Sequence, residues 1–561
     1  MALNFYRRVG FGLSPNEIQP SKPLNWALNQ LNSVPNFLWP GSTPTEKEMR
    51  NKLAEWVYGD RESLRKKYKN DQKAYEKAKD ELRIKTGESF FELNEHAIRH
   101  YQTKNSSQPV FERFWLFWGN HFAISEKDFL PEFSTGPYQR EIIRPNMIKT
   151  FQDMVQSVTT SWCMIHHLDN SQSVGPNSKS KQWNPRGTIN ENHARELLEL
   201  HTVSPSAGYT QEDVIQLAYI MTGWSHKWSN KKLETGDVWF DQDRHQTGEK
   251  QVLGVKYKND AKRELPKVIH DLATHPVCIK FVSTKLCRHF ITDEPTEEMV
   301  RPVIDVWNKY DGNLIEIQKE VVRQAYKYKD TTYKFQVPEV WLMQLSKIFD
   351  LNIPLLPSRM NYDFKTKPSH SQRRLSWWLR EIGHSPYRAK QPNGWSDFEV
   401  DWVSPELLLR RLWFSSNILP KMINQKSGHI INISSLAGKK GVAYNSVYSA
   451  SKAGLLMWSD ALRQEYKNSP IDISVICPGF ISEAGMFFDG NVDAPKILGT
   501  SSPQKVANAV IKALKKGSCE IIVNAGPIRP LLALGQISWK LADKITRLFG
   551  VPALSRKRIS V

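Results

Sequence analysis

Cysteine is scarce in this chain of 561 residues, which contains five of them and no C-x-x-C pair. Such an odd and widely spaced set gives no disulfide framework and is typical of a reducing compartment. No stretch reaches the roughly 18 consecutive apolar residues that a membrane-spanning helix needs. The first residues, MALNFYRRVGFGLSPNE, contain no apolar core of a secretory signal. We therefore expect a cytoplasmic protein without a transmembrane segment.

Acidic residues are outnumbered by basic ones, since 58 Asp and Glu stand against 77 Lys and Arg and leave a net charge of +19. The excess is concentrated near the C-terminus, where residues 419–561 carry 19 Lys and Arg and 8 Asp and Glu. A basic surface attracts nucleic acid, anionic lipid or phosphorylated cofactors. No zinc finger or RNA-recognition signature accompanies it, so we expect a solvated surface and no specific nucleic-acid partner.

The chain is too long for one ordinary hydrophobic core, and its length favours several domains. Its first part, to about residue 415, has the period and composition of a mostly helical domain. In this part five helices or helical hairpins are expected: Asp60 to Arg83, Val110 to Phe122, Asn190 to His201, Tyr209 to Trp224 and Asp311 to Tyr328. The first is charged all round and should be exposed, and the second is dense in aromatic residues and should be core.

After about Leu419 the pattern changes to short β-branched runs at 430–433, 473–477 and 520–523. Helical stretches at 448–466 and 503–515 separate them. Strands that alternate with helices favour a parallel sheet. We therefore predict a multidomain protein, with a mainly α-helical domain over residues 1–417 and a partial, Rossmann-like α/β segment over residues 418–561.

Three residues of the second segment have a spacing that suggests catalysis. Tyr448 and Lys452 are four residues apart, so a helix places both on one face. Ser435 lies 13 residues before Tyr448, just past an apolar run. Together with the words HIINISSLAG, YSASKAG and ICPGF, this triad resembles the catalytic segment of the short-chain dehydrogenase/reductase family.

That resemblance implies hydride transfer between a nicotinamide, NAD or NADP, and a small-molecule carbonyl or alcohol. Tyr448 would be the general acid and base; a free phenol titrates near pH 10, and the Lys452 cation would favour the phenolate. Lys452 would also hold the nicotinamide ribose, and Ser435 would hydrogen-bond the reacting oxygen. Pro478 and Gly479 resemble the loop that passes the nicotinamide amide. Glu483 stands where the family often has Thr.

The cofactor-binding half of that family is absent. A dinucleotide needs a glycine-rich turn at a helix N-terminus to hold its pyrophosphate, and the family's T-G-x-x-x-G-x-G word occurs nowhere in the chain. The resemblance is therefore to a truncated enzyme whose first strands are missing. The open sheet would have to be covered by the rest of the chain, by a second copy in a homo-oligomer or by a partner chain.

The N-terminal part resembles the bacterial domain-of-unknown-function 1800 family. The words that carry the resemblance follow one another in order and are RFWLFWGNHF, HHLDN, INENHARELLELHT, GYTQEDVIQLAYIMTGW, DRHQTGEKQVLG and THPVCIKFVSTKLCRHF. The resemblance implies a helical domain but no particular reaction. Relatives of this type often carry export signals, whereas none is visible in this sequence.

His193 and Glu196 form the clearest candidate metal pair, because three residues apart on one helix they are able to bind one ion, of unknown identity. Further candidates to converge on them are His121, His166, His167, Asp169, Glu191, Glu199, His201, His245 and His275. The alternative is that these are capping residues or satisfied core histidines.

A last segment, Leu531 to Phe549, has an apolar stripe with flanking cations. Such a stripe either lies on an anionic membrane surface or packs on its own domain or a dimer partner, and we expect packing. For the whole chain three functions remain open: an oxidoreductase, a role of the helical domain (metal-dependent, or binding and assembly) beside a silent C-terminal remnant, and a fusion without integrated function.

Overall fold

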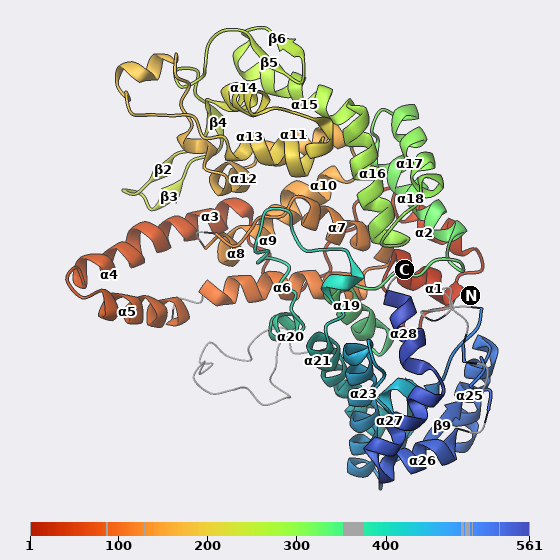
Figure 1. The fold of residues 1–561 in the computed structure, drawn as a ribbon. Helices are drawn as coiled ribbons and strands as arrows, with labels where there is room; N and C mark the ends of the chain where they lie inside the picture. Colours follow the sequence, from red (N-terminus) through yellow and green to blue (C-terminus); the bar gives the residue numbers. More distant parts are fainter. Residues whose placement is uncertain are drawn as a thin grey trace. The chain divides into compact units, whose positions relative to one another are not determined.

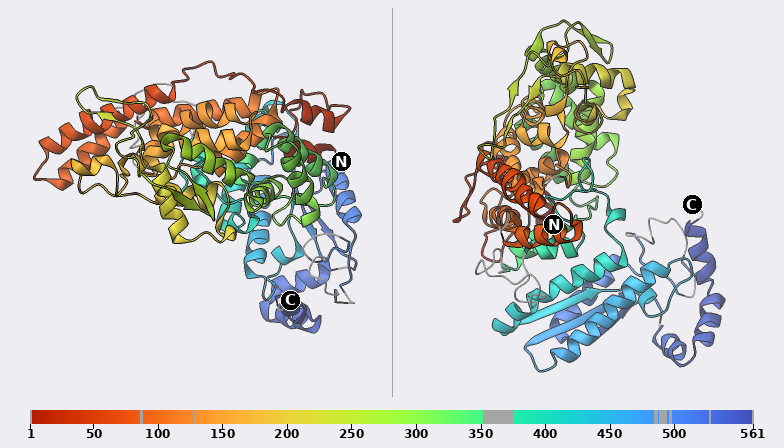
Figure 2. Two further views of the ribbon diagram at one scale, coloured as in Figure 1. Left: turned by 90° about the horizontal axis from the view of Figure 1, so that it is seen from above. Right: turned by 90° about the vertical axis from the view of Figure 1, so that its left-hand side faces the viewer.

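The computed structural model describes residues 2–85, 88–127, 129–351, 375–483, 487, 494–495, 498–526 and 528–559. The chain folds into two compact units, Met1–Glu399 and Val400–Val561, called here the N-terminal and the C-terminal unit (Figures 1 and 2). The first is almost all helical and the second contains a parallel sheet, so the expected fold class is confirmed. The boundary that the sequence predicts between residues 417 and 418 stays a prediction.

The helices of the N-terminal unit fall into two runs. Those before residue 200 are α1 (Ala2–Val9), α2 (Pro23–Asn29), α3 (Glu46–Ala54), α4 (Glu62–Lys67), α5 (Gln72–Lys85), α6 (Glu88–Asn105), α7 (Pro109–His121), α8 (Leu130–Phe133), α9 (Thr135–Tyr138), α10 (Arg144–Asn146), α11 (Phe151–Thr159), α12 (Trp162–His167) and α13 (Asn192–Glu196). Those after it are α14 (Gln211–Met221), α15 (Glu264–Thr274), α16 (Pro276–Phe290), α17 (Glu297–Lys309), α18 (Leu314–Lys327), α19 (Pro338–Ile348) and α20 (Leu375–Glu381).

Helix α7 is the centre of this unit, because every residue from Pro109 to His121 except Asn120 is buried. Its aromatic residues pack in one large core together with residues from α1, α11, α14, α16 and α18. The expectation that the aromatic segment forms core is therefore confirmed. Burial of so many large side chains is the main stabilising contribution of the unit.

Glu112 of α7 forms a buried ion pair with Arg144 of α10. The Glu112 carboxylate accepts hydrogen bonds from both terminal guanidinium nitrogens of Arg144 and from Nε2 of Gln102. The guanidinium carbon of Arg144 lies 4.6 Å from the ring centre of Phe37 and 4.9 Å from that of Trp115. Both charges are almost wholly inaccessible to solvent, so each depends on the other for its solvation.

Local sequence patterns explain several helix boundaries. Helices α4 and α5 form the exposed, charged helical hairpin expected for this segment, and they project from the unit in Figure 1. A capping box of Thr210 and Asp213 begins α14. The helix expected from Asn190 starts two residues later, at Asn192, whose backbone N–H donates to the Asn190 side chain.

Six short strands were not expected from the sequence. They pair as antiparallel two-stranded ribbons, β1 (Trp224–Ser225) with β4 (Trp239–Phe240), β2 (Trp228–Ser229) with β3 (Glu234–Thr235), and β5 (Lys250–Val252) with β6 (Val255–Tyr257). With two or three residues each, they are too short to leave a periodic pattern.

The C-terminal unit is built on three parallel strands in the order β7 (Gly428–Ile433), β8 (Ile471–Pro478) and β9 (Glu520–Val523), drawn as arrows in Figure 2. Its helices are α21 (Pro405–Ser415), α22 (Leu419–Asn424), α23 (Ser446–Glu465), α25 (Pro503–Lys516), α26 (Arg529–Ile537), α27 (Trp539–Leu548) and α28 (Val551–Ile559). The three predicted strands and the two predicted intervening helices are all present.

Strand β8 is central, and the helices cover it from both sides. On one face Ile476 packs with Ala509 and Ala513 of α25. On the other, Val475 and Cys477 pack with Leu456 of α23. All five cysteines of the chain are free thiols, so no disulfide holds these layers together; apolar packing does, with polar contacts such as the hydrogen bond from Asn432 Nδ2 in β7 to Ser459 Oγ in α23.

The amphipathic C-terminal segment differs from the single packed stripe that we expected. It forms two helices, because Ser538 ends α26 and caps α27 by accepting from the backbone N–H of Leu541. Leu534, Ile537, Leu541 and Leu548 are exposed, so these four residues do not pack on their own domain, and packing on a dimer partner stays a prediction. Among the described residues, no helix combines the length and the apolar character needed to cross a bilayer.

The Glu112–Arg144 pair gives a stability prediction. The substitution Glu112→Ala leaves a buried guanidinium without its counter-charge and should lower the free energy of unfolding of the N-terminal unit by about 3–5 kcal/mol. Glu55→Ala is the matched control, because Glu55 pairs with Lys52 near the surface and should contribute at most about 1 kcal/mol. Urea unfolding followed by tryptophan fluorescence measures both; equal losses would contradict the role given to the buried pair.

Candidate functional site

Ser435 lies immediately after β7, at the carboxyl edge of the sheet. Its Oγ accepts a hydrogen bond from the backbone N–H of Ala437 at 3.2 Å, and its hydroxyl lies 3.4 Å from the Pro478 carbonyl at the end of β8. The parallel register pairs Ile433 with Ile476, which brings the two loops together. The hydroxyl is thereby held at the edge where parallel sheets bind their ligands.

Tyr448 and Lys452 lie one turn apart at the start of α23, and the Lys452 ammonium is 5.6 Å from the Tyr448 ring centre. Lys452 Nζ donates to the Ile433 carbonyl at 3.3 Å. Burial lowers the pKa of Lys452 from its ordinary value. In the described part of the chain no hydrogen-bond partner of the Tyr448 hydroxyl is found, so this group is available to a ligand.

Two glycines allow the loops of the site to approach neighbouring backbone and side chains. A Cβ at Gly438 would lie 2.7 Å from the carbonyl carbon of Lys452, and one at Gly479 would lie 2.3 Å from Oδ1 of Asn524. The Ser434 hydroxyl donates to the Lys452 carbonyl at 2.8 Å. The loop after β7 is therefore fastened to the same turn of α23 that carries the lysine.

A cavity of about 630 Å³ opens beside these residues. Ser435, Tyr448 and Gly479 line one part of it, and apolar side chains of α26 to α28, among them Leu532, Ile545 and Phe549, line the rest. Its size and mostly apolar wall are typical of sites for small organic ligands.

The residues present fit only one end of a dinucleotide. Lys452 and Gly479, which the family resemblance assigns to the nicotinamide end, lie near the carboxyl edge of the sheet, where Lys452 Nζ donates to the Ile433 carbonyl. In the C-terminal unit, the described sheet ends at β7, and no strand followed by a glycine-rich turn is available there to hold a pyrophosphate.

The metal candidates lie in the N-terminal unit, and the structure gathers some of them. His193 is buried with both ring nitrogens unpartnered. Burial, followed by the nearby His201 and His167, lowers its pKa to about 3. Glu196, half-buried on the same helix, has its pKa raised by burial and by Glu199, which outweigh the lowering effect of Arg195.

Other members of the candidate set surround this histidine or lie elsewhere. Nε2 of His121 is 3.3 Å from the His201 carbonyl, and Lys285 Nζ is 3.0 Å from His121 Nδ1. A short π-helical turn, Leu197–His201, follows α13 and carries His201 into this cluster. Within the part of the chain that the structure describes, no group of three or more His, Cys, Asp or Glu side chains is placed to hold a metal ion. The metal pair stays a prediction.

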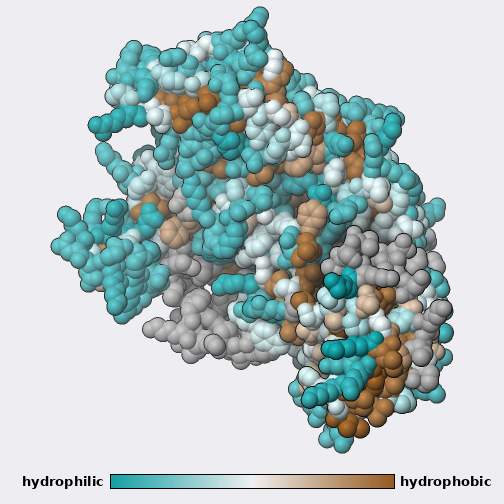
Figure 3. Space-filling model, in the orientation of Figure 1, coloured by the Kyte–Doolittle hydropathy of each residue, from teal (hydrophilic) through white to brown (hydrophobic). Residues whose placement is uncertain are grey.

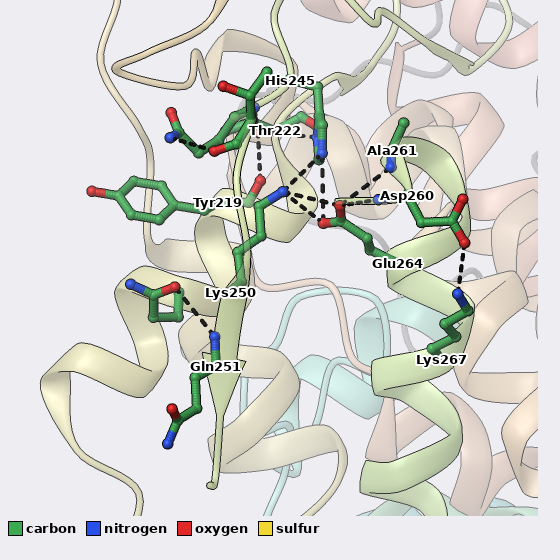
Figure 4. A network of polar contacts seen from close by, with 12 residues as sticks. Tyr219, Thr222, His245, Lys250, Gln251, Asp260, Ala261, Glu264 and Lys267 are labelled. Atoms are coloured by element: carbon green, nitrogen blue, oxygen red, sulfur yellow. Dashed lines mark hydrogen bonds and ion pairs between the residues drawn. The ribbon is translucent and has the colours of Figure 1, made fainter. Parts of the chain in front are cut away.

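His245 belongs to a separate structural network (Figure 4). Its Nδ1 lies 2.8 Å from the Thr222 carbonyl, and Lys250 Nζ bridges His245 Nε2 at 3.3 Å and Glu264 Oε1 at 3.0 Å. The same carboxylate accepts from the backbone N–H of Asp260 and so fixes the start of α15. The network joins α14, β5 and α15.

Two further histidines have other partners. His275 caps α16 by accepting from the backbone N–H of Val277. The sequence reasoning missed a buried pair in which His289 Nδ1 lies 2.6 Å from Asp397 Oδ1. The two residues are 108 positions apart, so no local pattern could have indicated the pair.

Comparison with known proteins gives the family. The chain belongs to the family described as a protein of unknown function, DUF1800. The family match covers residues 4–519, more than the 1–417 expected from the sequence words, and so continues into the C-terminal unit.

Curated relatives match only a segment. The "Ketoacyl reductase HetN" of Nostoc sp. is 53% identical over 165 residues, which is 28% of this chain and 58% of the relative. The "Dehydrogenase/reductase SDR family protein 7-like" of Anopheles gambiae is 34% identical over 124 residues, 20% of this chain and 38% of the relative. This DUF1800 chain thus spans about half of the curated relatives it matches, and a segment of it is similar to short-chain dehydrogenase/reductase oxidoreductases.

Two solved structures align with a segment of this chain at low TM-scores. A short-chain dehydrogenase from Burkholderia cenocepacia J2315 in complex with NADP aligns with a TM-score of 0.22 and 21% identity, over 26% of this chain and 58% of that one. A short-chain dehydrogenase from Streptomyces avermitilis aligns with a TM-score of 0.20 and 25% identity, over 26% of this chain and 61% of that one.

The close approach at Gly438 is testable with a control in the same loop. Gly438→Ala pushes a methyl group against the Lys452 backbone, and such overpacking should destabilise the C-terminal unit by about 1–3 kcal/mol. Gly441→Ala meets no heavy atom within 4 Å and should be neutral. Hydrogen exchange of the β8 amides reports this unit; unchanged protection in Gly438→Ala would contradict the packing described.

The buried histidines predict acid sensitivity of the N-terminal unit. Burial lowers the pKa of both His193 and His201 to about 3, whereas an unfolded histidine titrates near pH 6.5. Unfolding therefore takes up protons below about pH 6.5, and stability falls from there towards pH 3. His193→Gln should make the loss between pH 6.5 and 5 smaller by about 2 kcal/mol. Urea unfolding at several pH values measures this, and the exposed His270→Gln is the control; equal slopes would refute it.

Proposed function

We propose that the C-terminal unit is the substrate-binding and proton-donating half of a carbonyl reductase that acts on an apolar acyl substrate. The observation that supports this most directly is the cavity in which the side chains of Ser435 and Tyr448 meet an apolar wall from α26 to α28. The similarity to short-chain dehydrogenase/reductase oxidoreductases is further support, and the relative named as a ketoacyl reductase suggests the acyl class.

Each polar residue has a role that follows from its chemistry. The Tyr448 hydroxyl donates its proton to the carbonyl oxygen as the alcohol forms, and the Lys452 ammonium, 5.6 Å from the ring centre, stabilises the phenolate left behind. The Ser435 hydroxyl donates a hydrogen bond to the same carbonyl oxygen and so stabilises its developing negative charge.

The apolar wall determines the kind of substrate. The cavity is large enough for a medium or long chain, and its wall from α26 to α28 is mostly apolar; the further polar side chains of its lining are Lys439, Lys440, Asn445, Asn524 and Thr546. A substrate with its carbonyl at one end of an alkyl chain would hydrogen-bond to Ser435 and Tyr448 at the polar end of the cavity. Its alkyl chain would be buried against the apolar wall. Burial contributes about 0.8 kcal/mol for each methylene group removed from water.

NAD or NADP supplies the hydride when it is bound. Lys452, Pro478 and Gly479 are the residues proposed to meet its nicotinamide end. Because no glycine-rich turn is present in the sequence, the pyrophosphate end must be held by groups outside this unit. A partner chain of different sequence that pairs with the open edge of β7, where Ile433 is 41% exposed, is the proposed source.

The N-terminal unit supports an alternative, a metal-dependent function, through one observation. The buried His193 has two unpartnered ring nitrogens close to His167 and His201. A bound metal would give such a nitrogen a partner. Metal analysis of the purified chain tests this alternative, since a stoichiometric ion that is lost in His193→Gln would favour it.

Binding of an apolar carbonyl ligand tests the proposed function. We expect a 3-oxoacyl ester of twelve or so carbons to bind the full chain saturably in calorimetry. Removing one hydrogen-bond donor in Tyr448→Phe should weaken binding about fivefold, and a charge in the apolar wall, Leu532→Asp, should abolish it. Tyr444→Phe is the matched control, because Tyr444 is exposed and lies outside the cavity lining.

The cofactor is tested separately. With the ligand present, millimolar NADH or NADPH should be oxidised slowly, and Tyr448→Phe and Lys452→Ala should each remove this activity. Absence of saturable ligand binding would refute the proposed substrate site. Ligand binding without any nicotinamide binding at millimolar cofactor would refute catalysis by this chain alone.

A further inference from the structure

Helices α26 and α27 have a side that lines the cavity and a side that faces solvent. Leu532, Ile545 and Phe549 contribute to the cavity wall. On the solvent side, Ile537 is 82% exposed and Leu548 81%; Trp539, which also borders the cavity, is 79% exposed. We call the exposed residues together the outer face; they are Leu534, Ile537, Trp539, Lys540, Leu541, Lys544, Arg547 and Leu548.

Exposure of so many large apolar side chains on adjacent turns needs an explanation. Single exposed apolar residues are ordinary on protein surfaces, whereas a contiguous group marks an interaction site. Figure 3 shows brown apolar surface beside teal hydrophilic surface in the region of α26 and α27. Contact of the outer face with water is therefore unfavourable in free energy, and burying it against a partner surface would be favourable.

The cations of the outer face are arranged beside its apolar residues. Lys540, Lys544 and Arg547 recur at helical spacing along α27 and are exposed. The acidic side chain of α27, Asp543, is already paired with Lys440 at 2.7 Å. The face thus combines apolar side chains, an exposed Trp at the start of a helix and an excess of positive charge, which is the composition of helices that lie in an anionic membrane interface.

We propose that the outer face of α26 and α27 binds an anionic lipid surface. Apolar side chains would enter the acyl boundary while the three cations meet lipid phosphates, each contributing about a fivefold gain in partition. A second copy of the chain is a poorer occupant, because a symmetric contact would set these cations against the same cations of the partner. The proposal does not depend on the reductase function.

Vesicle co-sedimentation of the full chain tests the proposal. We expect binding to vesicles of phosphatidylglycerol and phosphatidylcholine, little binding to phosphatidylcholine alone, and weakening at high salt. Replacing Lys540, Lys544 and Arg547 together by Gln should lower the partition coefficient on the order of 100-fold. Replacing Lys66, Lys73 and Lys77, exposed lysines of the N-terminal unit, removes the same net charge and should change it little.

The apolar contribution has its own pair of variants. Ile537→Ser should weaken vesicle binding about tenfold, whereas Ile18→Ser, at a residue 93% exposed in the N-terminal unit, should not. Equal binding to neutral and anionic vesicles, or equal effects of the two charge variants, would overturn the proposal. Analytical ultracentrifugation that shows a dimer dissociated by Ile537→Ser, without vesicle binding, would assign the face to a second copy instead.

Discussion

Burial of strand β8 on both faces is the constraint on which the C-terminal unit depends. Ile476 faces α25 and Val475 faces α23, so the strand needs both helices before it is shielded from water. The parallel register then sets β7 beside it, with Ile433 opposite Ile476. The end of β7 and the end of β8 consequently meet at one edge, and Ser435 and Gly479 lie there for that reason.

The same constraint shows what the unit lacks. In the described part of the unit β7 has a strand on one side only, and the backbone carbonyl of Ile433 is met by the Lys452 ammonium. A lysine that would hold a cofactor ribose thus has a backbone acceptor. The described sheet thus has an open edge at β7 and the sequence has no glycine-rich turn, while the cavity beside Ser435 and Tyr448 is present.

The N-terminal unit follows a different principle, because its interior holds many charges as well as aromatic rings. Arg144 and Glu112 neutralise each other between Phe37 and Trp115. His193 and His201, by contrast, remain neutral because burial disfavours their charged form. Buried ionic pairs and neutral histidines both demand a fixed geometry, which fits a domain held together by non-local contacts rather than by a sheet.

Local chemistry and covalent spacing were sufficient to determine part of this structure from the sequence. The strands around Ile430, Ile473 and Ile521, the capping box at Thr210 and the Tyr448–Lys452 pair depend on near neighbours, and each was predictable. The tertiary structure decided the rest. It paired His289 with Asp397, broke the amphipathic segment at Ser538 and left Ile537 and Leu548 exposed. These outcomes depend on which surfaces distant in sequence come into contact. The periodicity of apolar residues indicates local secondary structure and does not identify such contacts.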